Sequence, residues 1–93
     1  MDVQTFDNVF DALADTPAEA ANMKARAELL SALRACVGAW GLPQEAAAAR
    51  LGITRPRLND LMRGKLAKFS LDSLVNLASA AGLALEIRIA NAA

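Results

Sequence analysis

The chain contains no histidine and no tyrosine, and it has a single cysteine, Cys36. Histidine is the side chain that most often exchanges protons near neutral pH, so the commonest general base of enzymes is missing. A lone cysteine cannot form an intramolecular disulfide, which is typical of a protein in a reducing compartment. No acidic cluster has metal-ligand spacing, and the glycines form no phosphate-binding loop. We therefore expect a cytoplasmic protein that is not an enzyme and holds no metal or cofactor.

Long apolar segments are also lacking. The sequence has no stretch of ~18 uncharged apolar residues, so we expect no transmembrane span. Residues 1–15 are acidic and contain no basic side chain, so they do not resemble a secretory leader. With 93 residues, the chain is expected to form one small domain that carries this acidic N-terminal segment.

Net charge is zero, because ten basic and ten acidic side chains balance, but the two signs are separated along the chain. Residues 1–22 contain five acidic and no basic side chains, a net −5. Residues 44–69 contain six basic and two acidic side chains, a net +4. A local basic surface of this kind suits a phosphate-rich partner such as nucleic acid.

The sequence of residues 44–63 predicts two short helices joined by a tight turn. The first helix would span 44–51, and Thr54 would cap a second helix that runs to about Arg63. Between them, Gly52 can adopt the positive φ that ends a helix and reverses the chain. This is the layout of a DNA-binding helix-turn-helix, whose second helix enters the major groove. The alternative is an ordinary helical hairpin, but the arginine-rich outward face of the second helix favours DNA.

The second helix and its flanks supply the candidate contacts to double-stranded DNA. Arginine matches guanine, asparagine matches adenine, an acidic side chain needs a cytosine amino group, and a proline ring can touch a thymine methyl. The predicted base-reading residues are Arg55, Pro56, Arg57, Asn59 and Asp60. The predicted phosphate contacts are Gln44, Thr54, Arg63, Lys65 and Lys68. Each arginine has the alternative of being a solvated surface residue.

The remaining patterns predict further helices and one strand. Thr16 to Glu19 form a capping box before apolar residues at helical spacing, which predicts a long helix over 17–39. A short amphipathic helix can form over 7–14, and Ser70 can cap another helix within 70–81. Residues 83–89 alternate between apolar and polar side chains, as a half-buried strand does. The expected fold is mainly α, a bundle of about five helices with a C-terminal β-strand.

The predicted strand has no partner strand elsewhere in the sequence, so its backbone groups need another source of hydrogen bonds. The simplest source is the same strand of a second copy, paired antiparallel about a two-fold axis in a homodimer. The alternatives are a frayed tail and a continuation of the preceding helix. The residues assigned to this dimer strand are Leu83, Leu85, Glu86, Ile87, Arg88 and Ile89.

From about Asn22 to Ile89, the sequence resembles the Xre/Cro-type helix-turn-helix family, and more narrowly its HigA-like antitoxin regulators. The resemblance rests on Gln44, Ala47, Ala48, LGIT (51–54), RPRLNDLMRGK (55–65) and FSLDSLVNLASAAGL (69–83). It implies a lambda-repressor-like homodimer that binds a palindromic operator and represses its own operon. Many members also bind a RelE-like mRNA interferase toxin. Pro43 departs from the family, which usually has a capping Thr there.

The acidic segment supplies a second hypothesis, a protein-binding module that mainly neutralises a basic toxin and binds DNA little. Its apolar side chains Val9, Phe10 and Leu13 could dock on such a partner. The alternative is that the segment covers the chain's own long helix. In the DNA-binding interpretation the protein is expected to be cytoplasmic and associated with the nucleoid.

Overall fold

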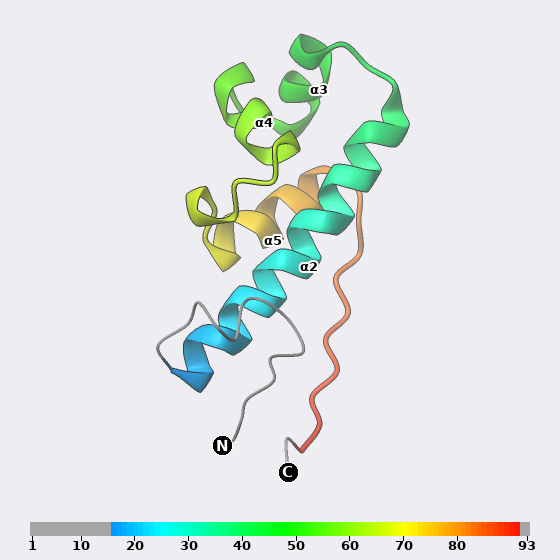
Figure 1. The fold of residues 1–93 in the computed structure, drawn as a ribbon. Coiled ribbons are helices and arrows are strands. Elements are labelled where there is room, and N and C mark those ends of the chain that lie inside the picture. The colour runs from blue at the N-terminus through cyan, green and yellow to red at the C-terminus, as the bar shows by residue number, and fades with distance from the viewer. Residues whose placement is uncertain (1–15, 92–93) are drawn as a thin grey trace.

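The computed structural model describes residues 16–91, which are almost entirely helical up to residue 82 (Figure 1). In chain order the elements are α2 (Pro17–Trp40), α3 (Gln44–Leu51), α4 (Arg55–Met62), the short 3₁₀ helix η1 (Leu66–Lys68) and α5 (Leu71–Ala80). The helix expected over 7–14 lies outside the described residues, as do Val9, Phe10 and Leu13. None of the helices within 16–91 is long and apolar enough to cross a lipid bilayer.

Helix α2 is the longest element, and its two ends have clear local causes. The hydroxyl oxygen of Thr16 accepts a hydrogen bond from the backbone N–H of Glu19 at 3.0 Å, and Pro17 occupies the first helical position. At the other end, Gly41 has φ 63°, a left-handed conformation that turns the chain out of the helix. The helix therefore extends to Trp40, one residue past the expected end at 39. Its 24 residues make a rod of about 36 Å that supports the other elements.

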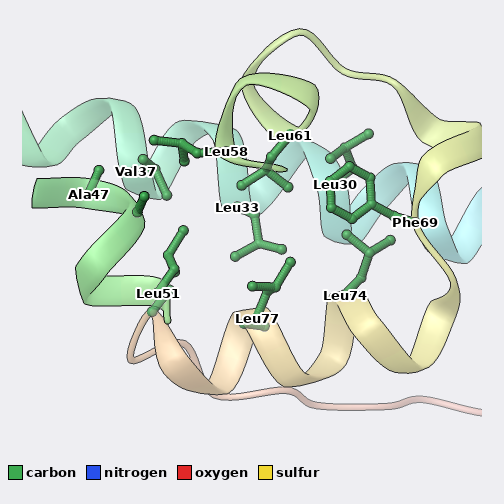
Figure 2. Close-up of a cluster of buried hydrophobic side chains, with 13 residues drawn as sticks. Leu30, Leu33, Val37, Ala47, Leu51, Leu58, Leu61, Phe69, Leu74 and Leu77 are labelled. Atoms are coloured by element: carbon green, nitrogen blue, oxygen red, sulfur yellow. The ribbon is translucent and has the colours of Figure 1, made fainter. Parts of the chain in front are cut away.

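The hydrophobic core lies between α2, α4 and α5, and α3 closes one end of it (Figure 2). Leu33 of α2 is fully buried, and its side chain lies between Leu61 of α4 and Leu77 of α5. Phe69, which follows η1, is the largest buried side chain and is 1% exposed. Within residues 16–91 no polar or charged residue is buried, so the interior of this core is made of apolar side chains.

The strand expected over residues 83–89 is not formed in the described chain. Residues 83–91 are neither helix nor strand, and they run alongside α2 towards its N-terminal end (Figure 1). The physical reason is that a strand exists only where a second strand supplies its ladder, and none lies within residues 16–91. The apolar side chains of this tail therefore stay exposed, with Leu85 at 45%, Ile87 at 73% and Ile89 at 90%.

Candidate nucleic-acid interface

The turn between α3 and α4 is held by a double hydrogen bond at the end of α3. Gly52 has φ 73°, and its backbone N–H donates to the carbonyl of Ala49 at 3.1 Å. The backbone N–H of Ile53 reaches one residue further back and donates to the carbonyl of Ala48 at 3.0 Å. This paired arrangement satisfies the last carbonyls of α3 and fixes the direction in which α4 leaves. Ala48 is also 2% exposed, and so small a side chain lets α4 cross close to α3.

Helix α4 begins at Arg55, directly after a cap. The hydroxyl oxygen of Thr54 accepts a hydrogen bond from the backbone N–H of Arg57 at 3.2 Å. Pro56 falls in the first turn, where its missing N–H costs no helical hydrogen bond. Thr54 was predicted to contact phosphate, and here its hydroxyl serves the start of the helix.

The two faces of α4 differ completely in environment. Leu58 and Leu61 are 1% and 0% exposed and anchor the helix in the core. On the outer side, Arg55 and Pro56 are exposed, and Asn59 is half-buried. The Arg55 guanidinium forms no hydrogen bond, ion pair or ring contact with any of residues 16–91. Its donors are therefore not engaged by the described part of the chain.

Arg57 takes a different place from the one expected for a base-reading side chain. Its guanidinium donates a hydrogen bond from Nη1 to the carbonyl of Lys68 at 2.6 Å. It also lies over the ring of Phe69, with the Cζ atom 4.0 Å from the ring centroid. These contacts join α4 to the last residue of η1 and to Phe69, which follows it. This geometry gives Arg57 a structural role in the unbound protein, because one of its donors and one face of its guanidinium are used within the chain.

Asp60 and Lys65 were assigned separately to bases and phosphates, but the structure brings them together. The Nζ atom of Lys65 lies 3.4 Å from Oδ1 of Asp60, and their side chains are 41% and 22% exposed. The pair neutralises part of the charge of each partner. It reduces the repulsion between Asp60 and a DNA phosphate, and it also weakens Lys65 as a phosphate contact.

A helix-turn-helix model matches residues 12–90, which is most of the 93 residues and includes all of α2, α3, α4 and α5. The chain belongs to the helix-turn-helix domain family. Membership of this family indicates a DNA-binding regulator. No curated protein matches the chain.

Within this helix-turn-helix domain, the remaining candidate phosphate contacts lie at the start of α3 and after the end of α4. Gln44 is exposed at the start of α3, where no side chain caps the helix, so the first backbone N–H groups of α3 are open to an anion. Arg63 and Lys68 are exposed on either side of Lys65. Together these residues put donors at both ends of the helix-turn-helix.

Two arginines of α2 belong to the same region, and the sequence analysis did not identify them. Nη1 of Arg26 donates to the carbonyls of Leu66 and Phe69 at 3.2 and 3.1 Å. Nε of Arg34 donates to the carbonyl of Met62 at 3.0 Å. Arg26, Arg34 and Arg57 thus fix the loop that follows α4, which carries Lys65 and Lys68. The only signal in the sequence was two arginines eight positions apart on the helix that packs against this loop.

No group of three or more His, Cys, Asp or Glu side chains within residues 16–91 is arranged to hold a metal ion. Cys36 is half-buried and its thiol lies 3.9 Å from the carbonyl oxygen of Ala81.

On α3, Arg50 stacks on the ring of Trp40, the last residue of α2, with Cζ 4.1 Å from the ring centroid. These contacts leave Arg55, Arg63 and Lys68 as the basic side chains of the helix-turn-helix without a partner in the described chain.

Proposed function

We propose that the protein is a sequence-specific DNA-binding transcriptional regulator in which α4 is the recognition helix. The observation that carries the proposal is the position of Arg55. It is exposed and unpartnered within residues 16–91, at the N-terminus of a helix that Leu58 and Leu61 anchor in the core. Recognition helices of this motif contact base edges with their N-terminal residues. Arg55 is therefore the main base-reading residue, with Pro56 and Asn59 beside it.

The phosphate-binding part of the surface is formed by Gln44, Arg63 and Lys68, with Lys65 contributing less because Asp60 holds it. The net charge of +4 over residues 44–69 supports this assignment. Each phosphate neutralised releases counterions, so binding is expected to weaken steeply as salt is raised. Arg57 and Asp60 are retained as positioning residues rather than as base readers.

The proposed functional form is a homodimer on a palindromic operator. Two recognition helices related by a two-fold axis read half-sites one helical turn apart, ~34 Å. The tail supports pairing between copies, because Leu85, Ile87 and Ile89 are exposed and residues 84–91 make no backbone hydrogen bond within residues 16–91. In this form the predicted strand is made on association.

The resemblance to HigA-like regulators extends the proposal to a type II toxin–antitoxin module. In that case the protein represses its own operon, binds a RelE-like mRNA interferase, works in the cytoplasm and has no catalytic activity. The acidic residues 1–22 favour the second candidate function, a module that mainly neutralises a basic toxin. A deletion of residues 1–15 tests this second function, because loss of toxin co-purification with unchanged DNA binding assigns the segment to the toxin.

The test of DNA reading compares Arg55→Ala with two controls on duplexes selected from a random pool. We expect Arg55→Ala to cost about 1–3 kcal/mol of binding and to relax preference at one base position per half-site. Lys68→Ala should weaken binding to all duplexes alike. It should also reduce the dependence of the binding constant on salt by the contribution of about one phosphate contact. Lys24→Ala, an exposed change on α2 away from α4, should leave binding unchanged. If Arg55→Ala binds every duplex as the parent does, α4 is not the reading helix.

A further inference from the structure

The C-terminal tail leaves its backbone unpaired in the described chain. The backbone N–H of Leu83 donates to the carbonyl of Ala78 at 2.9 Å, and no backbone hydrogen bond joins residues 84–91 to any part of 16–91. Exposure of the apolar side chains rises outward, from 45% at Leu85 to 90% at Ile89. An extended segment with open backbone groups and alternating apolar side chains is a template for another strand.

A groove lies beside the tail, between α2 and α5. Its volume is about 740 Å³. Its lining from the helices is mainly small and branched apolar side chains, Ala25, Leu29 and Ala32 from α2 with Leu71 and Val75 from α5. Glu28 of α2 is its one charged helical side chain within residues 16–91, and residues 83–88 form one wall. A two-stranded ribbon alone is at best marginally stable in water and needs an apolar surface beneath it. The groove supplies that surface.

We propose that a second copy of this chain binds here, with the two tails paired antiparallel and centred on Ile87. This proposal rests on the homodimer of the proposed function. It adds the register, that is, which residues of the two tails lie opposite each other. Around this centre, Ile87 lies opposite the partner's Ile87, and Leu85 lies opposite the partner's Ile89. Glu86 then lies opposite the partner's Arg88, and the symmetry makes this ion pair twice.

Charge complementarity selects this register among the alternatives. A two-fold axis normal to the ribbon keeps the apolar face of both tails on one side, so opposed residues always share a face. Centring on Glu86 or on Arg88 would place like charges opposite each other, which is destabilising. Centring on Leu85 would set Glu86 against Ala84 and leave Arg88 without a carboxylate. Only the ladder centred on Ile87 pairs every charge of the tail with its opposite.

The same register explains how the apolar tail becomes buried. Leu85, Ile87 and Ile89 of both copies form one continuous face of the ribbon, and that face covers the groove. The ribbon thereby gains the packing against helices that an isolated two-stranded sheet lacks. The tail then stops being an exposed edge that is open to further association.

A charge-swap series tests the register by measuring the dimer dissociation constant by sedimentation equilibrium. Glu86→Lys and Arg88→Glu each turn two attractions into two repulsions and should raise the constant roughly tenfold. The double variant Glu86→Lys with Arg88→Glu should restore the parental value within about twofold. Ala84→Lys adds a similar charge opposite the partner's Ala90 and should change little.

A cross-linking experiment gives an independent readout. In a Cys36→Ala background, Ile87→Cys should form a disulfide dimer under mild oxidation, whereas Glu86→Cys should cross-link much less. Preferential cross-linking of Glu86→Cys, or a double swap that stays as weak as either single change, would overturn the register. A parent that remains monomeric at all concentrations would overturn the pairing itself. DNA reading by α4 is tested separately by Arg55→Ala, so failure of one proposal is distinguishable from failure of the other.

Discussion

Replacing Arg57 with alanine should lower the free energy of unfolding and leave base preference intact. The sequence places Arg57 among the base-reading residues, two positions after Arg55 on the same short helix. In the structure its guanidinium is bonded to the Lys68 carbonyl at 2.6 Å and lies over the Phe69 ring at 4.0 Å. The same substitution is therefore expected to act differently at the two arginines. At Arg57 it should lower stability, and at Arg55 it should change base preference.

The expected loss for Arg57→Ala follows from its two contacts. A cation over an aromatic ring at a partly exposed site contributes about 0.5–1 kcal/mol. A hydrogen bond from a charged donor contributes about 1.5–3 kcal/mol when buried, and we take ~1 kcal/mol because this bond is open to solvent. The sum is about 1.5–2 kcal/mol. For a domain of this size it corresponds to a fall of about 10 °C in Tm.

Urea unfolding followed by far-ultraviolet circular dichroism measures this loss, and a double-mutant cycle with Phe69→Leu assigns it. Leucine keeps an apolar side chain at this buried position and removes the ring. The coupling energy between the two positions should be about 0.5–1 kcal/mol if the ring contact contributes to stability. Arg55→Ala is the matched control and should change stability by less than ~0.5 kcal/mol, because Arg55 is exposed and makes no hydrogen bond, ion pair or ring contact with residues 16–91. The reasoning fails if Arg57→Ala unfolds at the parental urea concentration while losing discrimination at a base pair.

Two further substitutions test the turn and the loop. Gly52→Ala should destabilise by about 1–2 kcal/mol in urea unfolding, because a Cβ at Gly52 meets nothing within 4 Å and only the positive φ is penalised. Gly38→Ala, equally uncrowded but inside helix α2, should instead stabilise by about 0.5–1 kcal/mol, and equal effects would contradict the argument. Arg26→Ala should cost about 1–2 kcal/mol and weaken all duplexes alike in fluorescence anisotropy, since it releases the Leu66 and Phe69 carbonyls. Lys24→Ala is its control on the same helix, and a base-specific effect of Arg26→Ala would count against a purely positioning role.

The helices could be predicted because their signals are local. Caps at Thr16, Thr54 and Ser70 each accept the backbone hydrogen bond that their position predicts. The glycine turn at Gly52 needs only the permissive backbone of one residue. Apolar spacing then places Leu58 and Leu61 in the core, whereas Arg55 is exposed because it is the first residue of the helix.

The contacts of the arginines could not be predicted in the same way. Arg57 bonds to a carbonyl eleven residues along the chain, and Arg26 to carbonyls forty and forty-three residues away. Spacing within a helix carries no information on such partners, because any exposed arginine suits either solvent or a distant carbonyl. The tail at 83–89 was assigned as a strand from its alternation alone, and alternation cannot supply the partner that a strand requires.

The division of α4 into an anchored face and an unpartnered face bears on how relatives of such a protein can diverge. Leu58 and Leu61 carry the attachment to the core, while Arg55 and Pro56 contribute almost nothing to it. After gene duplication, substitutions at the latter positions can redirect a paralogue to a new operator with little cost in folding. Changes at Arg57 or Phe69 lack that freedom, because there a new specificity would come with a weakened domain.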